Sequence, residues 1–238
     1  MTEFDRIRHA KSYPFPAPDH CFEYADGAWR RLDTHEFERN GRVPVLAAGS
    51  NQSPEQLARK YGHMAGIGNI PAQRGRLAGF DCVYAAHLTG YGSVPATFQH
   101  SPGTVVTVFV LWLTEPQLVR MHETEGNYTY DHLEDIAVTL DTGGVLDEAF
   151  AYSSKVGCLN HEGGCVSLAE IPAEGRVFPA LAQVEALELV RDRLAPGEPV
   201  DDFVVQHLED VELHARRSRA LGEGAIPAGY RRRTIVVL

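Results

Sequence analysis

Short runs of β-branched and aromatic residues, bounded by turn-forming residues, recur along the first two thirds of the chain. Runs of this kind are typical of strands. They predict strands at 43–48, 81–87, 104–113, 136–140 and 147–152, a hairpin at 21–32 turning at Asp26-Gly27, and a closing strand at 234–238. The run at 43–48 is short and almost entirely apolar, so we expect it to be buried.

Helical patterns are fewer and lie between or after these strands. Two helix starts resemble capping boxes, Ser53-Pro-Glu-Gln56 and Thr114-Glu-Pro-Gln117. Longer helices are predicted at 179–194 and at 202–221, the second ending at Gly222 as its C-cap.

The order of these elements predicts the fold class and the domain organisation. Strands that follow one another without regular crossover helices indicate an α+β fold with a mixed, curled sheet. We expect residues 1–42 to be an extension that packs on the core, and residues 43–238 to form the main domain.

Composition narrows the class of protein. The chain has 238 residues, 44% hydrophobic and 23% charged, which is ordinary for a soluble globular protein. Its net charge of −10 argues against a nucleic-acid binder, which needs cations to neutralise phosphate. The longest apolar run, 105–113, is too short to cross a membrane, and the N-terminus has no export signal. We therefore expect a cytoplasmic protein without membrane partners, and leave its oligomeric state open.

The four cysteines are expected to be free thiols in a reducing compartment. Cys158, His161 and Cys165 are close enough in sequence to offer three zinc ligands, but no fourth ligand is evident. A polar loop explains the same pattern. The sequence therefore predicts no metal site.

The turn at Gly49-Ser50-Asn51 joins a predicted strand to a predicted helix. Backbone N–H groups at a helix N-terminus are unpaired and favour anions, and a glycine before them lets a ligand approach the backbone. The turn is therefore a candidate cradle for a carboxylate, although a plain strand-to-helix connection accounts for it equally well. A serine nucleophile is not supported, because the Gly-x-Ser-x-Gly elbow is absent.

A second candidate lies at Glu123-Thr-Glu125-Gly126. Carboxylates two residues apart cannot share one helix face, so the two glutamates should have different environments. Glu125 is at the predicted helix end, where the negative end of the helix dipole makes it easier for a carboxylate to hold a proton. That suits proton transfer, although a surface glutamate at a frayed helix end fits the motif alone.

Taken together, these motifs resemble the γ-glutamylcyclotransferase-like family. That family has a strand ending in Tyr-Gly-Ser-Asn and, downstream, a Leu-Asp-x-x-Glu-Gly motif; here they read Ala48-Gly-Ser-Asn51 and Met121-His-Glu-Thr-Glu-Gly126. Pro102-Gly103 before a valine-rich strand, and the late Ile226-Pro-Ala-Gly-Tyr230, are similar to further family features. Two positions depart from the pattern: Ala48 replaces a tyrosine and His122 replaces an aspartate.

The resemblance implies a fold, a reaction and a set of residues. The fold would be a curled sheet or small barrel with flanking helices. The activity would be a cofactor-independent and metal-independent lyase or transferase that releases 5-oxoproline from a γ-glutamyl amino acid, peptide or amine. Glu125 would be the general acid/base, and the substrate-binding residues would be Gly49, Ser50, Asn51, Ala48, Tyr128 and Tyr152. The partner would be a small γ-glutamyl molecule whose leaving group the sequence does not identify.

Two other functions remain open at this stage. A non-catalytic or differently specialised binder of a small amino-acid derivative could use the same fold, and the departures at Ala48 and His122 keep this open. A metal-dependent hydrolase built on the 11 histidines lacks paired ligand spacing.

Overall fold

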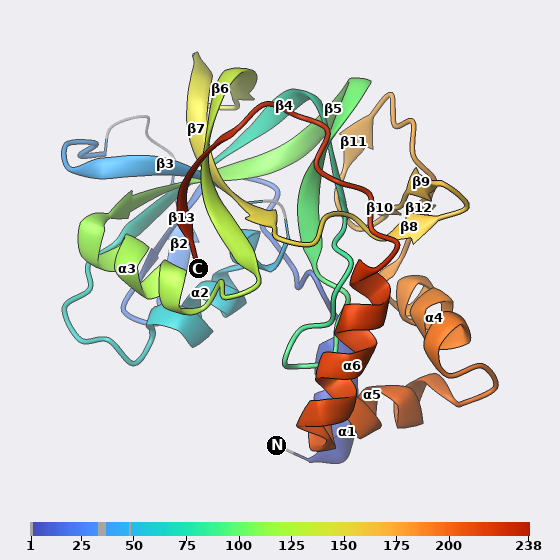
Figure 1. Cartoon of the computed structure of the whole chain (residues 1–238). Coiled ribbons are helices and arrows are strands. Elements are labelled where there is room, and N and C mark those ends of the chain that lie inside the picture. The colour runs from blue at the N-terminus through green and yellow to red at the C-terminus, as the bar shows by residue number, and fades with distance from the viewer. Residues whose placement is uncertain (1, 33–36, 48) are drawn as a thin grey trace.

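The computed structural model describes residues 2–32, 37–47 and 49–238 (Figure 1). Within these residues, five strands close into a barrel: β3 (Arg42–Ala47), β4 (Ile70–Tyr84), β5 (Ala96–Thr114), β6 (Tyr128–Leu140) and β7 (Val145–Ser154). Each strand pairs with two others, in the cyclic order β5-β3-β7-β6-β4 and back to β5. All these pairings are antiparallel except β3 with β7. The predicted α+β class with a mixed, curled sheet is therefore confirmed.

Two of the barrel strands are much longer than the hydrophobic runs that predicted them. β4 has 15 residues and β5 has 19, against the predicted 81–87 and 104–113. β4 includes polar or small residues such as Gln73 and Gly75, which interrupt the apolar pattern but stay paired with β5. A register shift between Ala78 and Phe80, around Gly79 at φ +76°, bends the pair. Bends of this kind help a sheet to curl and close.

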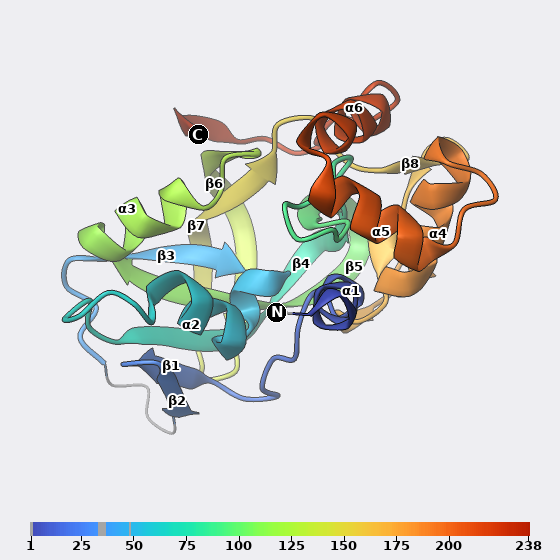
Figure 2. The same ribbon diagram turned by 90° about the horizontal axis from the view of Figure 1, so that it is seen from below.

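Helices gather in two groups on the barrel (Figures 1 and 2). One group is α2 (Pro54–Tyr61) with α3 (Glu115–Glu123). The other combines α1 (Glu3–Lys11) with α4 (Gln183–Leu194), α5 (Val200–Glu209) and α6 (Val211–Gly222). The remaining elements are short: η1 (Ser50–Gln52), β8 (Asn160–His161), β9 (Gly164–Cys165), β10 (Ser167–Leu168), β11 (Ala173–Glu174) and β12 (Ala180–Leu181).

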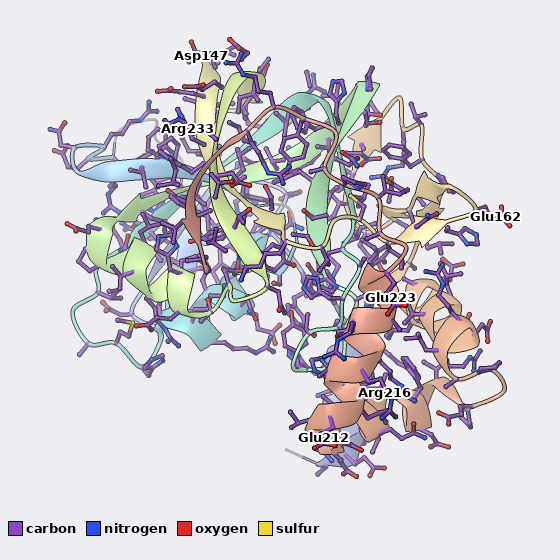
Figure 3. The ribbon with its side chains drawn as sticks, in the orientation of Figure 1. Asp147, Glu162, Glu212, Arg216, Glu223 and Arg233 are labelled. Atoms are coloured by element: carbon purple, nitrogen blue, oxygen red, sulfur yellow. The ribbon has the colours of Figure 1, made fainter. Side chains whose placement is uncertain are left out.

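The late helices correct the sequence prediction. The single helix expected at 202–221 is broken at Asp210, which ends α5 and starts α6 by accepting a hydrogen bond from the Leu213 N–H at 2.9 Å. The C-cap of α6 is Glu223, not Gly222. The break lets the two helices fold against each other, and charged residues such as Glu212, Arg216 and Glu223 lie along the exposed side of α6 (Figure 3).

The N-terminal region contacts the main domain at two places. The hairpin of β1 (Phe22–Ala25) and β2 (Ala28–Arg31) forms as predicted, with Asp26 and Gly27 at φ +49° and +80° in its turn, and β1 pairs with β4. The helix α1, which the sequence did not predict, packs on α4 and α5. The predicted closing strand is also confirmed: β13 (Arg233–Val237) pairs with β6. The division at residue 42 stays a prediction.

Alternation along β5 separates two hydrophobic clusters. Val108 and Val110 belong to a cluster that continues to Phe203 on α5, whereas Phe109 and Leu111 belong to a second cluster under α2 and α3. This follows from the two-residue side-chain period of a strand.

No helix in the part of the chain that the structure describes is long and apolar enough to span a bilayer.

Two histidines are buried where the late helices meet the connection between β4 and β5. Burial lowers the pKa of His87 and of His207 to about 4, from an ordinary value of 6.5. The unfolded chain therefore takes up protons first as pH falls through 6.5, so the free energy of unfolding falls between pH 6.5 and 4. Each histidine removes about 2 kcal/mol at pH 5 relative to pH 7.5.

We predict that His207→Leu halves this acid loss of stability. Urea unfolding at pH 7.5 and pH 5 measures it, with the exposed His63 replaced by Leu as the matched control. An acid loss of unchanged size in the His207 variant would show that other groups cause it.

Candidate active site

A cavity of about 410 Å³ opens between the two groups of helices. Its walls come from the turn after β3, from α2, from the segment after α3, from the connection between β4 and β5, and from α1. The predicted site residues that line it are Gly49, Ser50, Asn51, Glu125, Tyr128 and Tyr152. Ala48 lies outside the described residues. The fold thus brings together residues that are distant in sequence.

The turn after β3 requires glycine at its first position. Gly49 has φ +154° and ψ −151°, a region that residues with a Cβ avoid. A Cβ there would lie 2.7 Å from Tyr13 Oη and 2.9 Å from Ala96 Cβ. Tyr13 Oη in turn accepts a hydrogen bond from the Ala96 N–H at 2.8 Å. The N-terminal region and β5 therefore both pack directly against this turn.

The first backbone N–H groups of the turn have no acceptor in the part of the chain that the structure describes. The carbonyls of Gly49 and Ser50 accept hydrogen bonds from Gln52 and Ser53, forming η1. Among the described residues, no acceptor bonds the backbone N–H groups of Ser50 and Asn51. Two adjacent free amides on a cavity wall are suited to an anion.

The cap of α2 differs from the prediction. Ser53 is the N-cap residue and Pro54 follows it, but the Ser53 side chain makes no capping hydrogen bond and its buried Oγ has no partner among the described residues. The expected capping box with Gln56 is therefore wrong. The second expected box is supported, since the Gln117 side chain accepts from the Thr114 N–H at 2.9 Å.

Glu125 lies just beyond the end of α3 and is 8% exposed. Its Oε1 accepts hydrogen bonds from Asn51 Nδ2 at 3.0 Å and from Lys60 Nζ at 2.5 Å. The two motifs singled out in the sequence are 74 residues apart, and here they are in direct contact. The carboxylate and the turn with free amides thus belong to one site.

Lys60 is a functional candidate that sequence reasoning missed. It lies on α2 and is 4% exposed, so its ammonium compensates the buried charge of Glu125. The helix-end argument considered only the dipole and overlooked this ion pair. The sequence offered one signal for Lys60, which lies four residues after Gln56. Residues four apart share a helix face, and in the structure both residues line the cavity.

Glu123 lies in a different environment from Glu125, as expected. Its side chain is 57% exposed and accepts a hydrogen bond from Arg120 Nη1 at 2.8 Å. It is not among the residues that line the cavity. Its exposure makes it a natural comparison for Glu125.

Three tyrosines line the cavity beside Glu125. The Tyr128 hydroxyl donates to the Ala96 carbonyl at 3.0 Å, and the Tyr152 hydroxyl bonds His122 Nδ1 at 2.9 Å. Tyr91, which the sequence did not single out, lines the same cavity. Burial raises the pKa of Tyr91 to about 12 and raises the pKa of Tyr128 and Tyr152 further, so all three hydroxyls are neutral.

His87 is another cavity residue that the sequence did not indicate. It is 5% exposed and packs edge-on against Tyr128, with 5.4 Å between ring centroids. Its lowered pKa makes it a neutral imidazole near pH 7. Nothing local in the sequence marks His87, because it lies past the end of β4 and reaches the cavity only through the fold.

The cysteines lie away from this site. All four are free, as predicted, and all four are buried. The thiols of Cys158 and Cys165 lie 3.4 Å and 3.7 Å from Gln99 Nε2. Across residues 2–32, 37–47 and 49–238, the side chains close enough to share a metal ion are His132, Glu134 and Glu148, a group that does not include His161.

Among known proteins, the chain is similar to several solved structures. No family model and no curated protein matches the chain. A solution structure of a protein from Arabidopsis thaliana is 15% identical over 64% of this chain and 85% of its own, with a TM-score of 0.37. An uncharacterized protein from Homo sapiens is 15% identical over 82% and 94%, with a TM-score of 0.39. A gamma-glutamyl cyclotransferase is 16% identical over 81% and 93%, with a TM-score of 0.37.

We predict that Gly49→Ala destabilises the protein and distorts the turn. The unfavourable φ and the two close contacts should lower the free energy of unfolding by about 1–3 kcal/mol. Urea unfolding measures this loss. Gly126→Ala is the matched control, because a Cβ at Gly126 meets nothing within 4 Å. Equal stability of the two variants would contradict the strain assigned to Gly49.

Proposed function

We propose that this protein is a γ-glutamyl cyclotransferase, which closes the γ-glutamyl end of a small substrate into 5-oxoproline and releases the attached amine. The observation that carries the proposal is a buried carboxylate, Glu125, in contact with a turn whose first backbone amides have no acceptor among the described residues. A cavity of about 410 Å³ is within the usual range for small-molecule sites.

In the proposed complex, the turn binds the substrate's α-carboxylate. The N–H groups of Ser50 and Asn51 would donate to it, and the N-terminus of α2, a few residues later, adds partial positive charge. This anchoring places the substrate's α-amino group toward Glu125, whose Oε1 is bonded by the Asn51 side chain of the same turn.

The chemistry then needs one carboxylate. Glu125 takes a proton from the substrate's α-ammonium group, and the free amine attacks the γ-carbonyl carbon within the same molecule. Proximity accelerates this step because the reaction is intramolecular. As the bond between the γ-carbon and the leaving nitrogen breaks, Glu125 returns the proton to that nitrogen. The attacking nitrogen still carries one proton more than the lactam keeps, and Glu125 passes this second proton to the departing amine, which leaves as an ammonium. The products are 5-oxoproline and an amino acid, peptide or amine.

The neutral tyrosines suit the walls of such a cavity. Tyr128 and Tyr152 present ring surface to the substrate while their hydroxyls are bonded to Ala96 and His122. They are assigned to substrate binding. Tyr91 joins them, because it lines the same cavity.

We predict that Glu125→Gln folds normally and loses turnover by more than about 10²-fold, since the amide is nearly isosteric but cannot carry the proton. Release of 5-oxoproline from a panel of γ-glutamyl amino acids, peptides and amines measures it. Glu123→Gln is the control and should retain most activity, because Glu123 is exposed and outside the cavity.

Other outcomes of this experiment point to other functions. Binding of γ-glutamyl compounds by the unaltered protein without any 5-oxoproline would favour a non-catalytic binder. Near-normal turnover in Glu125→Gln would remove the mechanism.

We also predict that the substrate's α-carboxylate is essential for binding. A 4-aminobutanoyl compound, which is the γ-glutamyl substrate without that carboxylate, should show kcat/KM at least about 10²-fold lower, since two charge-assisted hydrogen bonds are lost. Steady-state kinetics on the matched pair of substrates measures it. Similar kcat/KM values for the two compounds would rule out the amide cradle.

A further inference from the structure

The hydrogen bonds on Glu125 are unevenly divided between its two oxygens. Lys60 Nζ and Asn51 Nδ2 both bond Oε1, at 2.5 Å and 3.0 Å. Oε2 accepts no hydrogen bond from the described residues, and it is not among the enclosed polar atoms that lack a partner. Oε2 is therefore the oxygen that faces the cavity.

Lys60 is itself held in place from several sides. Its Nζ contacts Met121 Sδ at 3.1 Å, and its backbone carbonyl accepts a hydrogen bond from Arg120 Nε at 2.9 Å. These two contacts tie Lys60 on α2 to α3, the helix that leads to Glu125. A long side chain fixed at both ends loses the freedom that usually weakens ion pairs.

Other titratable groups also face Glu125, from every surrounding element. They are Tyr61 on α2, His122 on α3, Tyr91 in the connection between β4 and β5, Tyr128 on β6 and Tyr152 on β7, with Arg59 and Arg120 on the cavity wall. Burial raises the pKa of each tyrosine and lowers the pKa of His122, which keeps these groups neutral near pH 7. Each arginine bonds a glutamate on its own helix, Glu55 or Glu123. Lys60 is the cation in direct contact with the Glu125 carboxylate.

Resting on the proposed function, we infer that Lys60 is a positioning residue for this reaction: with Asn51 it anchors Oε1 of Glu125, so that Oε2 is the atom that exchanges the proton. Its charge has two further effects. The ammonium compensates the charge of the buried carboxylate. It also disfavours a second ammonium beside it, which helps the substrate's α-ammonium group to give up its proton.

The test is kinetic and uses the full chain. In Lys60→Met, kcat should fall by at least about 10-fold at pH 7, and the acid limb of the kcat profile should move to higher pH, because the neighbouring cation is lost. KM should change little, since the α-carboxylate is bound by the turn. Lys60→Arg keeps the charge and should leave the acid limb where it is in the unaltered protein. Lys11→Met, which removes a surface lysine paired with Asp201, is the matched control.

A second measurement does not depend on turnover. Urea unfolding of the unaltered protein, Lys60→Met, Glu125→Gln and the double variant forms a double-mutant cycle. Lys60→Met should lower the urea midpoint in the unaltered background clearly more than in the Glu125→Gln background, because only the former leaves a buried carboxylate without its cation. A coupling of this sign would show that Lys60 and Glu125 are in contact in solution. The cooperative unfolding of each variant would show that it folds.

The outcomes separate the two proposals. If the unaltered protein releases no 5-oxoproline from any γ-glutamyl compound, the proposed function fails and this inference fails with it. If the unaltered protein is active but Lys60→Met keeps its kcat and its acid limb, the inference alone is overturned. Lack of coupling in the urea cycle overturns it as well.

Discussion

The ladder between β4 and β5 is the interaction on which the rest of this structure depends. It closes the sheet, because β5 also pairs with β3 while β4 pairs with β6. Closure fixes where the end of β3 lies relative to the segment between α3 and β6. Since the turn with Gly49 follows β3 and Glu125 precedes β6, the site exists only when the barrel is closed.

Segments outside the barrel complete the cavity, and they do so by close packing. Tyr13, from the segment after α1, presses against Gly49 and hydrogen-bonds Ala96 at the start of β5. The connection between β4 and β5, which contributes His87 and Tyr91, is held by the late helices: Leu88 N–H donates to Ser218 Oγ at 3.2 Å. The N-terminal region and α6 therefore shape the site even though neither carries the carboxylate.

Burial creates the electrostatic character of the cavity. A carboxylate taken out of water needs compensation, which Glu125 receives from Lys60 and Asn51. The surrounding tyrosines and His87 stay neutral because the same burial disfavours their charged forms. In the cavity, the carboxylate of Glu125 thus lies beside its compensating cation and among neutral tyrosine hydroxyl groups, with Arg59 and Arg120 also on the wall.

Local sequence determined what depends on nearest neighbours along the chain. The hairpin at Asp26-Gly27, the strand at 43–48, the closing strand and the helix end near Glu125 could be predicted, because turn chemistry and side-chain periodicity act over a few residues. The resemblance also singled out Gly49 and Glu125. Where polar residues interrupt the pattern, as in β4, or a capping residue breaks a helix, as at Asp210, prediction was incomplete.

Only the tertiary structure decided which distant groups meet. His87 and Tyr91 carry no local mark, and they and Lys60 meet in the cavity through packing between elements far apart in the chain. The pairing of Lys60 with Glu125 changes the electrostatics that the helix end alone suggested, because a cation in contact outweighs partial charges at a helix terminus. The sequence thus indicated the carboxylate of Glu125 and the turn at Gly49. The closed barrel determined which side chains contact that carboxylate, and so which cation compensates its charge.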